Sequence, residues 1–340
     1  MSMSIINGQK QRNARGRLFV YLTLCVLACS AISGLVVGSV PTTAREVVDA
    51  LLALGNAENE NAIIIWSLRL PRVTTAILVG ACMALSGALM QGLTRNPLAD
   101  PTLTGVAAGA ACAIVAAQTF WPALPFAFQP ILGIAGGLCA ATLTFALVRR
   151  DHFSPIRLAL AGLSVNAFLA AGITTIVLLS GPDAASLFFW LSGGLAGRSW
   201  DDVALLWPWA LVAAALAAIC TRALNIMSLG DDAAQGLGLH LGRWRLLCCL
   251  AAIASTAAAV AIAGPLGFVG LCAPHVARLC VGNDHRYLLA GSALFGAALV
   301  CTADLLARTV AAPRELPAGF LTALIAAPLL IRLIHTREPQ

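Results

Sequence analysis

The sequence predicts an all-α integral membrane protein with about ten transmembrane helices. Of its 340 residues, 59% are hydrophobic and only 11% are charged, and the mean hydropathy is +0.87. A water-soluble domain does not need so many apolar residues, whereas helices that cross a bilayer do. The 30 glycines fit this class, because small residues let helices approach closely in lipid. We therefore expect one polytopic domain over residues 1–340.

Apolar stretches of the length needed to cross a hydrocarbon core recur along the whole chain. The expected spans are 18–40, 73–93, 102–120, 131–148, 158–180, 203–219, 246–263, 266–281, 287–307 and 316–334. Basic residues before the first span also resemble the start of a signal peptide. The apolar run is longer than a signal core, however, and other spans follow it, which favours an uncleaved first span.

The placement of arginines predicts how these spans are oriented. Arginines of the larger set fall on one side of the membrane, which the positive-inside rule makes cytoplasmic. That set is Arg12, Arg15, Arg17, Arg95, Arg149, Arg150, Arg157, Arg222, Arg243, Arg245, Arg278, Arg286, Arg332 and Arg337. Both termini are then cytoplasmic, with residues 1–17 as a tail and 222–245 as a loop. The loops 41–68 and 181–202 face outward.

Aromatic residues in the second outward loop are expected to anchor it at the membrane interface, which is where such side chains concentrate. They are Phe188, Phe189, Trp190 and Trp200.

The most polar interruption in the second half of the chain is 228–241, S-L-G-D-D-A-A-Q-G-L-G-L-H-L. Asp231 or Asp232 can cap a helix start, and Gly236 and Gly238 can end that helix one to two turns later. Leu229, Ala233 and Leu237 then share one face. So short a helix is not stable alone and must dock on another surface. The alternative is an ordinary cytoplasmic loop.

A second motif lies at the outer end of the second span, where R-L-P-R occupies 69–72. Its arginines either flank the span at the interface or form a positive docking site for acidic residues of an extracytoplasmic partner. Arginines outside the membrane run against the positive-inside rule, which favours docking. Arg308, on the same side, would extend this patch.

Within the second span, Gly80, Ala84 and Gly87 predict a ridge of small residues for close helix packing. The segment R-N-P-L-A-D-P at 95–101 predicts a rigid polar turn, because a residue before proline avoids the helical conformation.

The chemistry of coupled ions and of enzymes is missing. Nearly every carboxylate lies in a predicted loop; the exception, Asp304, is expected to pair with Arg308 at i,i+4. The spans therefore offer few carboxylates that could bind a coupled proton or cation, which disfavours an ion-coupled secondary carrier. A membrane-embedded enzyme is also disfavoured, because the sequence shows no paired acids and no nucleophile–base arrangement. Lys10 is the only lysine and lies in no P-loop, so ATP would be bound by another polypeptide.

Other ligand classes find no support either. The 11 cysteines include no C-x-x-C pair and lie mostly in apolar runs, so we assign neither a metal site nor a disulfide. Basic residues are scattered between spans, and we expect no binding of nucleic acid.

The chain resembles the FecCD family of ABC importer permeases, which serve iron–siderophore, haem and vitamin B12 uptake. The matching stretches extend from the second span to the last. They are R-L-P-R (69–72), S-G-A-L-M-Q (86–91), R-N-P-L-A-D-P (95–101), L-G-D-D-A-A-Q-G-L-G (229–238), A-G-P-L-G-F-V-G-L-C-A-P-H-V-A-R (263–278) and E-L-P-A-G (315–319). F-F-W-L-S-G-G (188–194) and D-L-L-A-R (304–308) are most similar to iron(III) dicitrate and hydroxamate-type permeases.

The resemblance implies the type II ABC importer permease fold in the bacterial cytoplasmic (inner) membrane. It implies a permease dimer, homo- or heteromeric, two ATP-binding subunits that carry ATP and Mg, and a substrate-binding protein outside. It implies no cofactor and no catalytic residue on this chain. The segment that would couple to the ATPase comprises Leu229, Gly230, Asp231, Asp232, Ala233, Gly236, Leu237 and Gly238.

The resemblance also implies that Arg69, Arg72 and Arg308 meet glutamates of the binding protein, and that Ser164 and Asn166 lie near the translocation path. A ferric siderophore-type chelate is the expected substrate, with haem and vitamin B12 as alternatives. An ion-coupled carrier remains the less favoured interpretation of the chain.

Overall fold

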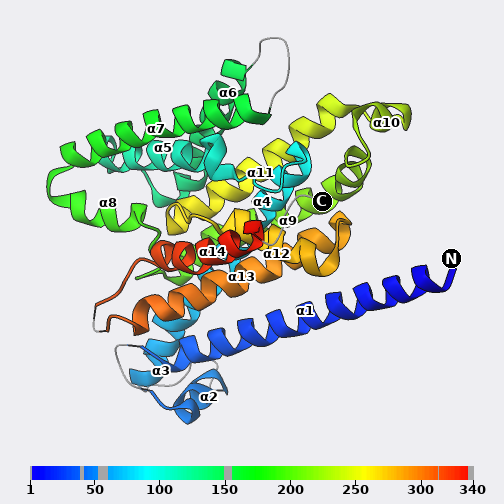
Figure 1. Ribbon diagram of the computed structural model, residues 1–340. Helices are drawn as coiled ribbons and strands as arrows, with labels where there is room; N and C mark the ends of the chain where they lie inside the picture. The colour runs from blue at the N-terminus through cyan, green and yellow to red at the C-terminus, as the bar shows by residue number, and fades with distance from the viewer. Residues whose placement is uncertain (1, 39–41, 53–59, 149–154, 313, 336–340) are drawn as a thin grey trace.

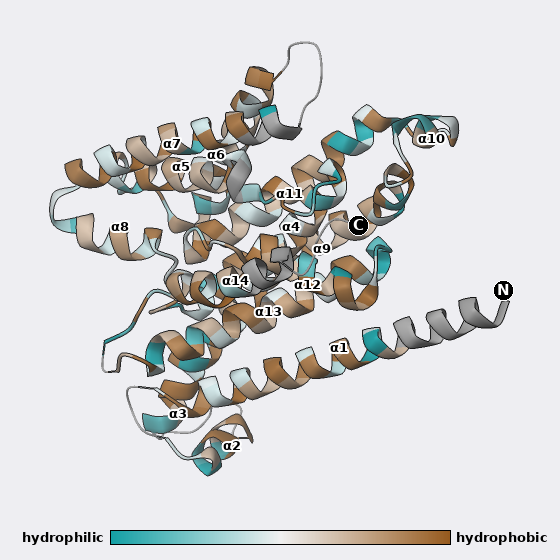
Figure 2. Cartoon of the chain, viewed as in Figure 1, coloured by the Kyte–Doolittle hydropathy of each residue, from teal (hydrophilic) through white to brown (hydrophobic). Residues whose placement is uncertain are grey.

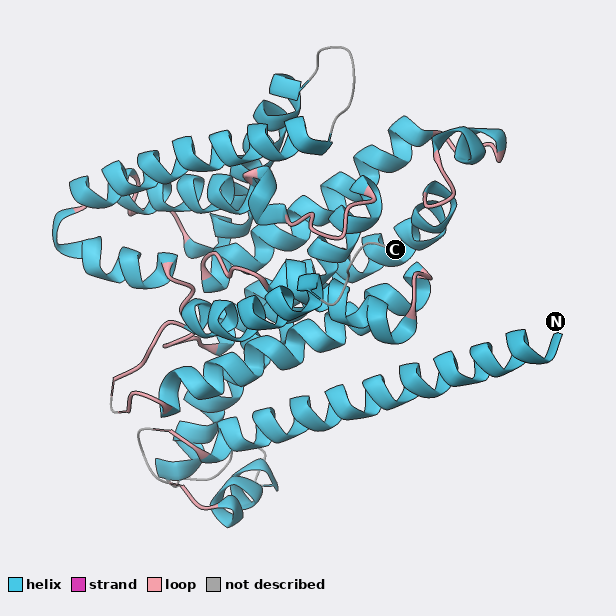
Figure 3. Cartoon of the chain, in the orientation of Figure 1, coloured by secondary structure: helices cyan, strands magenta, loops and turns pink. Residues whose placement is uncertain are grey.

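The computed structural model describes residues 2–38, 42–52, 60–148, 155–312 and 314–335, and these fold into helices with no strand (Figures 1 and 3). The helices are α1 (Ser2–Val36), α2 (Ala44–Leu52), α3 (Glu60–Ile64), α4 (Leu70–Thr94), α5 (Val106–Phe120), α6 (Gln129–Val148), α7 (Pro155–Leu179), α8 (Ala184–Leu191), α9 (Trp200–Met227), α10 (Asp231–Gly236), α11 (Leu241–Ala263), α12 (Val269–Val281), α13 (His285–Thr309) and α14 (Ala318–His335). A π-helical turn, Ile65–Arg69, joins α3 to α4.

Each of the ten predicted spans coincides with an apolar helix. Among the described residues, seven helical stretches are long and apolar enough to cross a membrane, and they include α1, α4, α6, α7, α9, α11 and α13. The other three predicted spans correspond to α5, α12 and α14, whose apolar stretches are shorter. The fold is thus that of a polytopic helical membrane protein, and its long helices consist largely of hydrophobic residues (Figure 2).

Helix α4 lies at the centre of the bundle. In the stretch that ends with α4, 78% of the residues in the apolar segment are buried, against 11% in the apolar segment of α7, which lies at the periphery. Helix α4 packs on α9, α11, α12 and α13. Its small residues permit this, as the sequence predicts: a Cβ on Gly80 would overlap the backbone of Gly296 in α13, and one on Gly87 would overlap Gly270 in α12. Ser86 Oγ adds a hydrogen bond to the carbonyl of Ala252 in α11, at 2.7 Å.

This packing predicts a large cost for Gly87→Val. A valine side chain there cannot be accommodated without separating α4 from α12, so we expect destabilisation of at least about 1–3 kcal/mol. The matched control is Gly172→Val in α7, where an added Cβ meets nothing within 4 Å. Thermal unfolding of the detergent-solubilised protein, followed by size-exclusion chromatography, measures both. Equal unfolding temperatures for the two variants would contradict close packing at Gly87.

The first helix differs from its predicted bounds at both ends. Residues 2–17, expected as a tail, continue α1 as a helix, and its apolar part begins at Ala14. The helix ends at Val36 rather than residue 40. Its last carbonyls are taken by side chains from elsewhere in the chain, including Thr42 Oγ1, which donates to the carbonyl of Val36 at 2.9 Å.

The predicted outward loops contain helices that hydropathy did not reveal, namely α2, α3 and α8. They are short and lie at one end of the bundle (Figure 1). In α8, Phe188 is exposed as an interface anchor should be, but Trp190 is not an anchor: it is buried, and its carbonyl faces Gly264 at the end of α11. Trp200 is 42% exposed and donates from Nε1 to the carbonyl of Trp66 at 2.7 Å.

Candidate functional site

The polar segment between α9 and α11 contains the expected short helix, α10, at the end of the bundle where α1 also begins (Figure 1). The loop is shorter than the predicted 222–245. Residues 222–227 continue α9 and 241–245 begin α11, because charged side chains end an apolar run without ending a helix. The caps also differ: Gly230, with φ +112°, precedes α10, and neither aspartate caps it. Gly236 is its last helical residue, and only Gly238 is left-handed, with φ +80°.

Asp231, in the first turn of α10, lies between two arginines instead. One carboxylate oxygen pairs with Arg95, and the other accepts a hydrogen bond from Arg245 Nη2 at 2.6 Å. Arg95 is the residue at which α4 ends, in a left-handed conformation with φ 52°. Arg245 lies in the first turns of α11. The Arg95–Asp231–Arg245 clamp therefore connects α10 to the central helix as well as to α11.

Apolar side chains in and next to α10 are left uncovered by the residues that the structure describes. Leu229 and Leu237 are 65% and 64% exposed, and Ala233 between them is also exposed. The predicted single helical face is wrong for Leu229, which lies in the turn before the non-helical Gly230. Ala234, by contrast, is fully buried in a hydrophobic cluster and packs α10 against the bundle. Exposed apolar side chains gathered in one place are typical of a site that binds another protein.

A second polar contact braces the same end of the bundle. Asn225, near the end of α9, donates from Nδ2 to Asp284 at 2.8 Å, and its Oδ1 accepts from the backbone N–H of His285 at 2.9 Å. Asp284 caps α13, and the backbone N–H of Arg286, followed by Asn225, lowers the pKa of its carboxyl. These bonds connect α9 directly to α13 beside the α10 segment.

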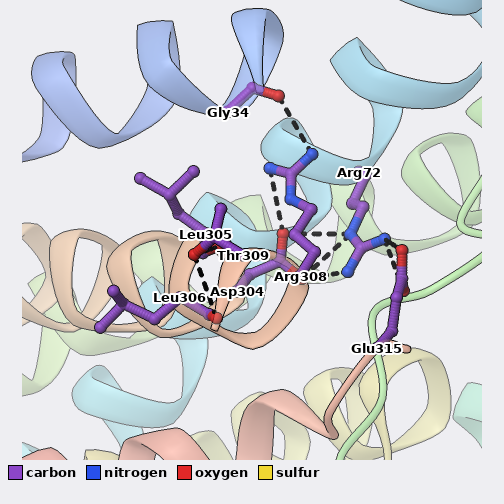
Figure 4. A network of polar contacts seen from close by, with 8 residues as sticks. All are labelled: Gly34, Arg72, Asp304, Leu305, Leu306, Arg308, Thr309 and Glu315. Atoms are coloured by element: carbon purple, nitrogen blue, oxygen red, sulfur yellow. Dashed lines mark hydrogen bonds and ion pairs between the residues drawn. The ribbon is translucent and has the colours of Figure 1, made fainter. Parts of the chain in front are cut away.

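At the opposite end of α4, Arg72 lies in a buried ionic network (Figure 4). Its Nε and Nη2 donate to Asp304 of α13 at 3.0 and 2.8 Å. Its Nη1 donates to both carboxylate oxygens of Glu315 at 3.0 Å. Arg308 pairs with Asp304 at 3.4 Å, which confirms the expected i,i+4 pair. The dominant partner of Asp304 is nevertheless Arg72, which sequence reasoning missed.

The other two predicted docking arginines donate hydrogen bonds to backbone carbonyls at the end of α1. Arg69 Nη1 donates to the carbonyls of Leu35 and Val36 at 2.6 and 2.8 Å. Arg308 Nη1 donates to the carbonyl of Gly34 at 3.0 Å, and a Cβ on Gly34 would lie 2.8 Å from Arg308 Nη2. Arg69, Arg72 and Arg308 thus gather at one end of the bundle as expected, but each is buried. Docking by these residues stays a prediction.

The predicted path residues lie apart from both clusters. Ser164 and Asn166 belong to α7, and the Ser164 hydroxyl donates to the carbonyl of Leu160 in its own helix at 2.9 Å. Because α7 is the least buried of the long apolar helices, these residues lie at the outside of a single chain. Their role in transport stays a prediction. Among the described residues, no three histidine, cysteine, aspartate or glutamate side chains gather as a metal ion requires.

Comparison with known proteins identifies the family. The model of the FecCD transport family matches residues 24–336. The chain belongs to the FecCD family. The Fe(3+)-citrate import system permease protein YfmE of Bacillus subtilis is 36% identical over 95% of this chain and 96% of its own length. The iron(3+)-hydroxamate import system permease protein FhuB of the same organism is 40% identical over 91% of this chain and 81% of its own.

A solved structure agrees with the sequence comparison. A protein described as a metal-chelate type ABC transporter, in an inward-facing conformation, has a TM-score of 0.79 and 30% identity, covering 94% of this chain and 99% of its own. The FecCD chain described here therefore has the type II ABC permease fold. It is a multi-pass permease of the bacterial inner membrane and is not itself an enzyme.

Proposed function

We propose that this chain is the transmembrane subunit of an ATP-driven importer for ferric siderophore-type chelates. It pairs with a second permease subunit, and two ATPase subunits bind ATP and Mg. An extracytoplasmic binding protein delivers the substrate. All ten apolar helices span the membrane, with both termini and α10 on the cytoplasmic side and α2, α3 and α8 outside. Haem and vitamin B12 are the alternative substrates, because permeases named for hemin and for cobalamin are also relatives of this chain.

The observation that carries this proposal is the exposed apolar face of α10, held in place by the Arg95–Asp231–Arg245 clamp. Leu229, Ala233 and Leu237, which lie before, within and directly after α10, form an exposed apolar surface that suits a groove in another protein. A groove of this kind on the ATPase would grip α10, and the clamp would pass its displacement to α4 and α11. The translocation path, with Ser164 and Asn166 near it, would then open alternately to each side.

An ion-coupled carrier is less well supported. Such a carrier needs an intramembrane acid that can bind a proton or a cation and release it. The one predicted candidate, Asp304, is held by two arginines, and its side chain is only 2% exposed. Both of its carboxylate oxygens are engaged by arginines, which suits a structural role.

The test is the ATPase activity of the permease co-purified with its ATPase subunits in lipid nanodiscs. We expect ATP hydrolysis to rise several-fold when a binding protein loaded with ferric chelate is added, and not with the unloaded protein. Loading the binding protein with ferric citrate, a ferric hydroxamate, haemin or cobalamin in turn identifies the substrate. Failure of an ATPase to co-purify, or transport that stops with an ionophore rather than with ATP depletion, would contradict the importer.

A further inference from the structure

The ionic network at the outer end of α4 has one exposed member. The side chains of Arg72, Asp304 and Arg308 are 10%, 2% and 6% exposed, whereas that of Glu315 is 37% exposed. Glu315 lies in the connection between α13 and α14 and covers the Nη1 edge of the Arg72 guanidinium (Figure 4). From the solvent side, Arg72 is therefore reached where Glu315 now binds.

We propose that Glu315 is an internal counter-ion that a carboxylate of the docking binding protein displaces from Arg72. This inference rests on the proposed function, in which Arg72 receives an acidic residue of that protein. A guanidinium has five N–H donors, and here Nε and Nη2 are committed to Asp304 while Nη1 is committed to Glu315. Because Glu315 is the exposed member of the network, a carboxylate that approaches Arg72 from solvent meets the position that Glu315 occupies.

The two carboxylates differ in the cost of leaving Arg72. Asp304 is enclosed between Arg72 and Arg308, so moving it would strand two buried cations. Glu315 is already more than a third exposed, and its carboxylate can return to water at small cost. Exchange at Glu315 keeps Arg72 fully paired before and after docking. It also makes docking selective, since only a partner that supplies a carboxylate at this position compensates the lost pair.

The connection that carries Glu315 contacts other elements. Leu316 donates from its backbone N–H to the carbonyl of Ala307 in α13, and Gly319 donates to the carbonyl of Gly193 after α8, at 2.9 and 3.0 Å. Release of Glu315 therefore occurs beside the start of α14.

Removing the glutamate charge should favour docking, because the partner carboxylate then meets no competitor.

The experiment measures binding of the chelate-loaded binding protein, the one that stimulates the ATPase, to the permease–ATPase complex in nanodiscs. We compare the wild type with Glu315→Gln, Arg72→Gln and Asp201→Asn. The last is a matched control, because it removes one exposed carboxylate at the start of α9 that takes no part in the network. In parallel, modification of Arg72 by phenylglyoxal is followed by mass spectrometry.

We expect Glu315→Gln to lower the Kd roughly two- to fivefold, with little change for Asp201→Asn and weaker binding for Arg72→Gln. Arg72 should react faster with phenylglyoxal in Glu315→Gln than in the wild type, and bound partner should protect it in both. Weaker or unchanged binding by Glu315→Gln, with normal wild-type binding, would overturn the exchange alone. Wild-type docking that does not depend on Arg72 would overturn the docking role and the exchange with it.

Discussion

Replacing Asp304 by asparagine is expected to prevent the protein from accumulating in folded form. The asparagine would keep the shape of the side chain but leave Arg72 and Arg308 buried without their shared anion. Breaking a buried ion pair by removing one partner costs about 3–5 kcal/mol, because the remaining charge is uncompensated. A cost of that size is a large part of the stability of a typical domain. The measurement is the yield of monodisperse protein in mild detergent, together with its unfolding temperature.

Two further variants separate the charge effect from a general loss of packing. Asp49→Asn removes an aspartate from an exposed pair with Arg45 at 4.0 Å, and we expect no measurable change. The double variant Asp304→Asn/Arg308→Met removes one cation along with the anion and should recover part of the lost stability. If Asp304→Asn unfolds at the wild-type temperature, the network does not stabilise the contact of α4 with α13 around Arg72.

The network also marks the limit of what one sequence can predict. The i,i+4 pair of Asp304 and Arg308 followed from helical spacing, which is a local property. The pairs of Arg72 with Asp304 and Glu315 join residues more than 200 positions apart. No periodicity records such a contact, because it depends on how α4 and α13 cross. Gly80 and Gly87 indicated that a close crossing exists, but not which helix approaches.

The α10 segment shows the same division. The short helix was predictable from the sequence, but the spacing of Leu229, Ala233 and Leu237 wrongly placed all three on one helical face, because Gly230 keeps Leu229 outside α10. The role of Asp231 was not predictable: an aspartate at a helix start is most simply a cap, and only the fold brings Arg95 and Arg245 to it. Hydropathy likewise located the ten apolar helices but not α2, α3 or α8, whose lengths are too short for a span.

Replacing Asp231 by lysine is expected to uncouple ATP hydrolysis from transport without blocking membrane insertion. The side chains of the clamp are about 40% exposed, so each lost pair contributes on the order of 0.2–1 kcal/mol, and a third cation between Arg95 and Arg245 adds repulsion. The start of α10 would leave α4. We expect chelate uptake to fall roughly tenfold or more, while the protein still purifies with native elution behaviour. Uptake into proteoliposomes with internal ATP measures the loss.

The neighbouring residue provides the control that decides between the clamp and the charge of α10 itself. Asp232 is exposed in the same turn, so Asp232→Lys changes the net charge equally and leaves Arg95 and Arg245 paired with Asp231. We expect it to transport far better than Asp231→Lys. Exchanging the charges in Arg95→Glu/Asp231→Lys should then restore part of the uptake, because the pair re-forms with opposite polarity. Equal losses for Asp231→Lys and Asp232→Lys, with no rescue by the exchange, would mean that α10 requires its negative charge for the ATPase rather than for its attachment to α4.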